Sequence, residues 1–117
     1  MTIVREQIDE TGTLRIHTME GCEVVWEFLG EDGLTPDPTP PTTLRFGVET
    51  GFSKLLSTGA QPHLFILILT KVEAEDIRAA ATSAGQTKPR NVRWAVADES
   101  SSIPQTIWEG IVEWDGW

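Results

Sequence analysis

The 117-residue sequence contains a single cysteine, Cys22, and two histidines, His17 and His63. A lone cysteine excludes an intrachain disulfide, and one cysteine with two distant histidines is too few for a structural zinc site. Neither histidine lies beside a serine or cysteine in a known nucleophile motif. We therefore expect Cys22 to be a small apolar strand residue and both histidines to be surface or structural residues.

Long apolar runs are also missing. The longest, Leu64–Leu69, has the length of a strand, whereas a membrane-spanning helix needs about 20 apolar residues. The first ten residues contain no basic region followed by an apolar core, so we expect no secretory signal. The sequence predicts no contact with a membrane.

Basic residues are scarce: 9 Lys and Arg stand against 18 Asp and Glu, which gives a net charge of −9. Such a charge repels nucleic acid and attracts a basic partner. Glycine-rich phosphate-binding motifs are absent, and the acidic stretch 31–37 lacks the residue order of a calcium loop. We expect no cofactor, no metal site, no nucleic acid and no small-molecule substrate, and therefore no enzymatic activity.

What the sequence does contain is alternation of apolar and polar residues, which is typical of half-buried strands. The turn Met19-Glu20-Gly21 lies between the runs around 14–16 and 22–29, which are therefore expected to be adjacent strands. Further strands are predicted at 44–48, weakly at 51–59, at 92–97 and at 107–114, with a polar turn at 98–104. The run 63–69 is apolar on both faces, which favours a central strand covered on both sides.

Two segments fall outside this pattern. Prolines crowd the connection 30–43, where Pro38, Pro40 and Pro41 cannot donate ladder hydrogen bonds, so we expect an extended, polyproline-like segment. We expect residues 1–11 to form an N-terminal arm.

One helix is predicted, over about residues 71–83. Thr70 and Glu73 have the spacing of a capping box, and Gly85 is a suitable stop. The predicted apolar stripe consists of Val72, Ile77, Ala80, Ala81 and Ala84. Together, these elements predict a single domain over 1–117, an antiparallel Ig-like β-sandwich of about seven strands with one short helix. A partly open barrel is the alternative.

The five tryptophans separate into two groups. Trp26 and Trp94 lie in the middle of apolar strand faces and are expected in the core. Trp108, Trp114 and Trp117 crowd the end of the sequence, where an aromatic side chain either folds back or docks against a neighbour. The candidate interface residues are therefore Trp114, Trp117, Pro38, Pro40 and Pro41.

The order of elements resembles a known class of domain. The stretches that carry the resemblance are 64–70, 72–77, 92–98 and 107–112, and it extends over most of 12–114. This order is similar to the small β-sandwich domains of tailed-phage virions, such as the N-terminal domain of baseplate upper proteins and similar minor tail proteins.

The resemblance implies an assembly role in a virion, built in the host cytoplasm, with other virion proteins and with itself in a homo-oligomer. It carries no catalytic residues. Because baseplate domains continue into fibre-like segments and this sequence does not, we expect an adaptor, a minor tail component or a capsid decoration protein. The charge of −9 leaves a second hypothesis open, an acidic inhibitor or immunity protein that masks a basic toxin or nuclease. A carbohydrate-binding module that uses Trp114 and Trp117 is a third.

Overall fold

A computed structural model describes residues 2–5, 13–17, 22–30, 32, 34–59 and 61–115. Within these ranges the chain forms nine strands and one helix. Their bounds are β1 Thr2–Arg5, β2 Thr13–His17, β3 Cys22–Leu29, β4 Leu44–Val48, β5 Ser53–Leu55, β6 Ser57–Thr58, β7 Leu64–Leu69, α1 Lys71–Ala80, β8 Val92–Asp98 and β9 Gln105–Asp115.

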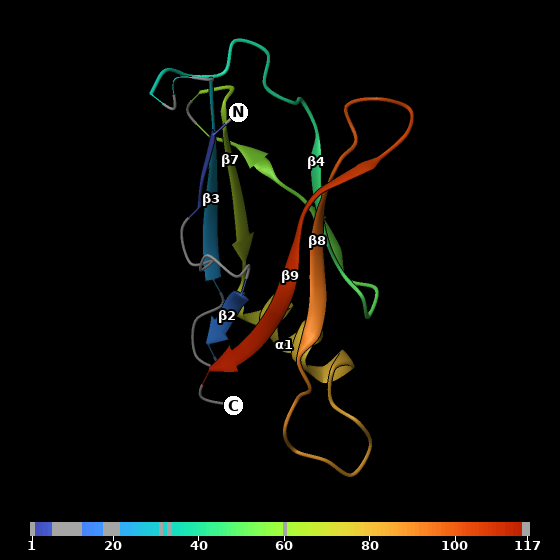
Figure 1. Ribbon diagram of the computed structural model, residues 1–117. Coiled ribbons are helices and arrows are strands. Elements are labelled where there is room, and N and C mark those ends of the chain that lie inside the picture. The colour runs from blue at the N-terminus through green and yellow to red at the C-terminus, as the bar shows by residue number, and fades with distance from the viewer. Residues whose placement is uncertain are drawn as a thin grey trace.

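The strands form two sheets, a four-stranded sheet in the order β1-β3-β7-β6 and a five-stranded sheet in the order β2-β9-β8-β4-β5. The sheets lie face to face, and α1 lies at one end between them (Figure 1). This confirms the mainly β, sandwich-like fold with one helix that the sequence predicts. The described strands outnumber the seven expected, because 53–58 contains two short strands and 2–5 contains another.

The pairing of the first strands differs from the prediction. The strands β2 and β3 belong to different sheets and are not adjacent. Instead, β2 pairs in parallel with β9, with Leu14 opposite Val112, so the five-stranded sheet is not purely antiparallel. Alternation identifies the buried face of a strand but not its sheet, because both sheets turn an apolar face toward the same core.

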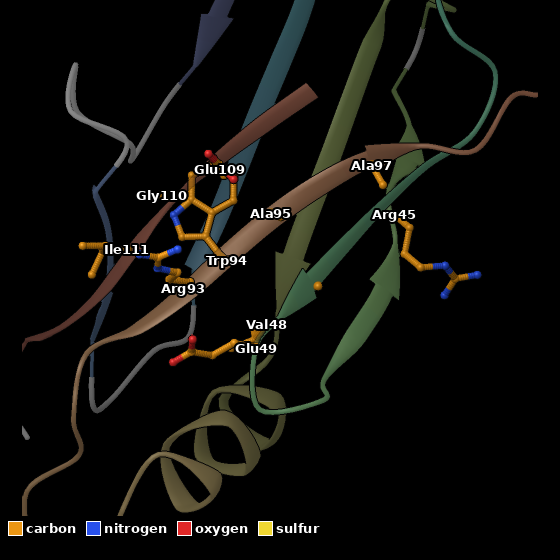
Figure 2. Close-up of a pocket in the computed structure, with 11 residues that line it drawn as sticks. Arg45, Val48, Glu49, Arg93, Trp94, Ala95, Ala97, Glu109, Gly110 and Ile111 are labelled. Carbon is orange, nitrogen blue, oxygen red and sulfur yellow. The ribbon is translucent and has the colours of Figure 1, made fainter. Parts of the chain in front are cut away.

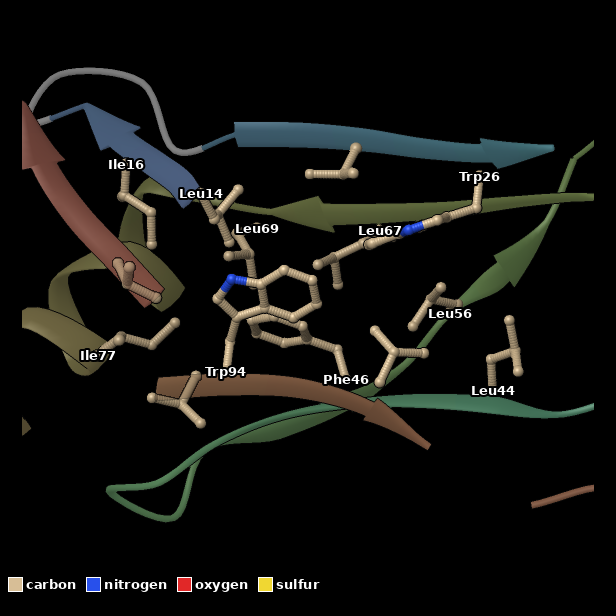
Figure 3. Packing of buried hydrophobic residues seen from close by; sticks show 14 of the residues in the cluster. Leu14, Ile16, Trp26, Leu44, Phe46, Leu56, Leu67, Leu69, Ile77 and Trp94 are labelled. Atoms are coloured by element: carbon tan, nitrogen blue, oxygen red, sulfur yellow. The ribbon is translucent and has the colours of Figure 1, made fainter. Parts of the chain in front are cut away.

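The core fills the space between the two sheets. Trp26 and Trp94 are fully buried, as predicted, and Trp94 lies beside Phe46 and close to Ile77 and Leu69 (Figure 3). Trp108 of β9 stacks on Trp26 across the sandwich, with ring centroids 5.3 Å apart and an interplanar angle of 12°. Aromatic pairs add stabilising free energy beyond that of their buried area, so this stack helps to hold the two sheets together.

The helix α1 begins with the predicted capping box. The Thr70 backbone amide donates to Glu73 Oε1 at 3.0 Å, and the Glu73 amide donates to Thr70 Oγ1 at 3.2 Å. The helix ends at Ala80 rather than near 83, where the Ala81 amide donates to the carbonyls of Ile77 and Arg78. Its buried stripe also differs: Ala74, Ile77 and Ala81 are buried, whereas Val72 is 71% exposed and Ala80 and Ala84 are exposed.

The proline-rich connection folds back instead of running extended throughout. Asp32 accepts hydrogen bonds from the amides of Leu34 and Thr35, and the Gly30 amide donates to the Thr35 carbonyl at 2.8 Å. Further on, Ser100 Oγ accepts from the amides of Thr42 and Thr43. These bonds join the connection to the loop between β8 and β9, at the end of the sandwich opposite α1 (Figure 1).

Part of the expected N-terminal arm is a strand. Thr2–Arg5 pairs antiparallel with β3 and forms an edge of the four-stranded sheet. The β-branched residues Thr2, Ile3 and Val4 favour this conformation. The rest of the predicted arm, residue 1 and residues 6–11, lies outside the described residues.

The strand β7 departs from the expectation of two covered faces. Its residues Phe65, Leu67 and Leu69 are buried against the core, but Leu64 and Ile66 are only half-buried and Ile68 is 49% exposed. The second apolar row of β7 therefore lies on the outer face of the four-stranded sheet. Exposed apolar faces of this kind are common sites of protein–protein contact.

Candidate functional site

The outer face of the five-stranded sheet contains a hollow of about 720 Å³ across β4, β8 and β9. Its floor is low because the outward positions in the middle of these strands are Gly47, Ala95 and Ala97. Gly47 lies opposite Ala95, so this row has almost no side chains where it crosses β4 and β8. A Cβ atom added at Gly47 would meet only the Phe52 carbonyl oxygen, at 3.8 Å, so the space above this row is open.

Charged side chains border the hollow, and two of them, Arg45 and Glu49, pair within the chain. Arg45 Nε lies 3.1 Å from Glu99 Oε1, and Arg90 Nη1 lies 2.9 Å from Glu49 Oε1. Farther along the same face, Arg15 Nε lies 3.5 Å from Glu113 Oε2.

Two bordering charges are different. Arg93 and Glu109 have no ion-pair partner among the residues that the structure describes, and both are exposed. They lie on the same side of the hollow as Ile111, whereas Arg45 lies on the other side and points away (Figure 2). Ile111 is 47% exposed in the middle of a strand. The hollow thus combines an apolar contact with one unpaired cation and one unpaired anion.

The outer face of the four-stranded sheet also carries exposed and half-buried apolar residues. Val25 lies opposite Ile66, and Glu23 lies opposite Ile68. Val25, Ile66, Ile68 and Leu64 form an apolar strip, and the carboxylates of Glu23 and Glu27 on β3 lie beside it. Both outer faces of the sandwich therefore present an exposed isoleucine, Ile68 of β7 on one and Ile111 of β9 on the other.

The structure separates the predicted interface residues. Trp114 is half-buried against the core, and its indole Nε1 donates to the Arg90 carbonyl at 2.9 Å. Pro38 is exposed, and Pro40 and Pro41 are partly buried in the connection next to the loop between β8 and β9. Trp117 lies outside the described residues. The three prolines thus lie at one end of the sandwich, and Trp114 lies along β9 toward the other.

Cys22 and His63 lie in structural surroundings. Burial raises the pKa of the Cys22 thiol to about 12, against the weaker opposing effect of a backbone hydrogen bond with Leu69. His63 is buried, and its carbonyl accepts from the Phe28 amide at 2.9 Å. The side chain of His17 lies outside the described residues.

Among the described residues, no group of three or more His, Cys, Asp or Glu side chains is placed to hold a metal ion. Within the same part of the chain, no helix has the length and apolar character needed to cross a bilayer. No protein-family profile, curated protein or solved structure matches the chain.

Sequence reasoning did not identify the hollow, although a signal for it exists. In β4 and β8 the buried positions are large, whereas the outward positions between them include Gly47, Ala95 and Ala97. Large residues alternating with very small ones, in place of polar ones, indicate a sheet face that another surface can approach closely.

Proposed function

We propose that this protein is a structural component of a tailed-phage virion, a minor tail, baseplate or adaptor protein that acts through protein–protein contacts rather than by catalysis. The observation that supports the proposal is the presence of exposed apolar residues on both outer faces of one small sandwich. Ile68 on the four-stranded sheet and Ile111 on the five-stranded sheet are 49% and 47% exposed.

Two contact surfaces on opposite faces suit a repeating assembly. A subunit that binds a neighbour on each side extends into a ring or a stack, whereas one surface alone gives at most a closed pair. The resemblance of the element order to small phage β-sandwich domains supports the same role. A capsid decoration protein would use the same surfaces.

The test is a pull-down of the tagged, full-length protein from lysate of its native source, followed by mass spectrometry. Recovery of tail or baseplate proteins supports the proposal, and recovery of major capsid protein moves the role to decoration. Purified virions that contain no copy of the chain would contradict both.

A second candidate function is inhibition of a basic toxin or nuclease, and the net charge of −9 favours it. Long-range attraction to a cationic partner weakens as salt rises, because counterions screen exposed charges beyond about 10 Å at 0.1 M salt. This function predicts one captured basic protein whose affinity falls steeply with salt. Several captured virion proteins with salt-tolerant binding would exclude it.

A further inference from the structure

We propose that the outer face of the five-stranded sheet is a self-association surface, on which a second copy of this chain binds through a two-fold axis. The proposal deepens the assembly role proposed above and rests on it. It names the surface and the partner: the face around the hollow, occupied by the same face of another copy.

Four outward residues on β8 and β9 form the centre of the proposed surface. Arg93 lies opposite Ile111, and Ala95 lies opposite Glu109. They form the corners of one block, with the unpaired cation and the unpaired anion on one diagonal and the two apolar residues on the other. Diagonal neighbours in a sheet lie roughly 7–8 Å apart, and Arg93 and Glu109 form no ion pair with any residue that the structure describes.

Such a block is complementary to itself. Consider a two-fold axis that lies in the plane of the face, along the line from Ile111 to Ala95. This axis places Ile111 against Ile111 of the second copy and Ala95 against Ala95 of the second copy. The same axis places Arg93 against Glu109 of the second copy, and Glu109 against Arg93 of that copy. Two ion pairs and one isoleucine contact then form from residues that lack these partners in the single chain.

Neighbouring residues agree with this axis. Continued past Ala95, the line reaches Arg45, whose charge Glu99 already offsets at 3.1 Å. Gly47 meets Ala97 of the second copy, so two small residues face each other where the sheets must approach most closely. The strands of the two copies cross steeply, as in orthogonal sheet packing.

The size of the face sets the expected strength. Five strands about 4.8 Å apart and about 20 Å long present roughly 400–500 Å² in projection. Specific, stable interfaces bury about 800 Å² per partner, so this face offers roughly half that area, as in weak and transient contacts. We therefore expect a reversible dimer with micromolar or weaker affinity, strengthened in a particle by the high local concentration of copies.

The experiment is analytical ultracentrifugation of the full chain from micromolar to millimolar concentration, with two matched variants. Ile111→Gln and Ile68→Gln make the same change at nearly equal exposure on opposite outer faces. We expect Ile111→Gln to weaken self-association roughly tenfold or more, because the contact is repeated across the axis, and Ile68→Gln to leave it unchanged.

Charge reversal tests the axis itself. Arg93→Glu and Glu109→Arg should each weaken the dimer by roughly tenfold or more, because each places like charges together, and the double reversal should restore it. Lys88→Glu, at an exposed loop position, changes the net charge as much as Arg93→Glu and should have little effect. Near-UV circular dichroism checks that each variant is folded.

Three results would overturn the inference. They are a protein that stays monomeric at millimolar concentration, a dimer that Ile68→Gln weakens and Ile111→Gln does not, and a double reversal that fails to restore association. None of them removes the proposed virion role, which the pull-down tests separately. A chain that dimerises as described but is missing from virions would instead contradict the proposed function alone.

Discussion

At the scale of single residues, the indole of Trp26 has the clearest energetic consequence. Its side chain is fully buried, as expected, but its Nε1 has no hydrogen-bond partner among the described residues. Nothing in the alternation of β3 reveals this, because the partner of a buried indole depends on the facing sheet. Trp108, which stacks on Trp26, comes from the other end of the sequence.

The orphaned indole leads to a prediction about Trp26. Leaving a buried donor unpaired costs about 1–3 kcal/mol, and Trp26→Phe removes that donor while keeping an aromatic ring against Trp108. We expect the stabilisation from removing this donor to offset most of the free-energy cost of the lost side-chain volume. The free energy of unfolding of Trp26→Phe should therefore lie within about 1 kcal/mol of the wild-type value. Trp26→Ala should cost about 3–5 kcal/mol. Urea titration measures the free energy of unfolding of both variants. Equal losses of stability would show that the unpaired N–H does not destabilise the wild type.

Cys22 supplies a prediction about pH. Its pKa is raised by burial from an ordinary 9.0 to about 12, so the folded state holds the thiol proton more tightly than the unfolded state does. Its contribution to stability is therefore full below pH 9 and is lost as the pH rises from 9 toward 12. At pH 8 a disulfide reagent such as Ellman's should label the folded protein far more slowly than the guanidinium-unfolded protein. Equal labelling rates would contradict the burial of this thiol.

At the scale of elements, local signals succeed where the interaction itself is local. The capping box of α1 is visible in the sequence because its two members are three residues apart. The prediction of which residues of this helix are buried was wrong at Val72, which is exposed, and it missed Ala74, which is buried. Helical periodicity allows several stripes on an alanine-rich helix, and contact with the sheets selects among them. In the same way, the apolar residues on both faces of β7 did not indicate that one of these faces is exposed to solvent.

The cap of α1 carries the element-scale prediction. Thr70→Ala removes the acceptor for the Glu73 amide and should cost about 1 kcal/mol, whereas Thr70→Ser keeps an acceptor and should cost little. Thermal unfolding compares the two variants. If they lose the same amount, the side-chain hydroxyl does not cap the helix.

Glu73 adds a pH dependence to this cap. Partial burial raises the pKa of its carboxyl, but hydrogen bonds from Lys54, at 2.7 Å, and from Thr70 outweigh burial, so the pKa lies below its ordinary value of 4.5. The carboxylate therefore stabilises the fold above that value, and the contribution is lost as the pH falls through the folded pKa. The wild type should therefore be more stable than Glu73→Gln near neutral pH. This difference in the free energy of unfolding should shrink as the pH falls below the ordinary pKa of the carboxyl group.

At the scale of the whole molecule, the fold class follows from the sequence but the topology does not. Alternating strands with one capped helix predict a sandwich, and two sheets with a helix at one end are observed. The sheet order depends on pairings between distant segments, such as β2 with β9. The candidate self-association face is a product of that order, because its block of four residues exists only where β8 and β9 pair in this register.

The same topology predicts slow folding. The pairing of β2 with β9 joins residues 13–17 to residues 111–115, and the Trp26–Trp108 stack joins the two sheets. Closing such long loops costs entropy before the contacts form, so all-β domains of this kind fold in milliseconds to seconds. The helix α1, with ten residues, is too short to be stable alone and should form together with the sheets.

Stopped-flow refolding measures this directly, since Trp26 and Trp108 come together only when both sheets are in place. We expect a single fluorescence phase on the millisecond-to-second scale, with the helical circular dichroism signal rising at the same rate. Folding within microseconds would mean that local contacts dominate the rate-limiting step, against this topology. A helical signal that forms long before the tryptophan signal would show that α1 is stable without the sheets it packs against.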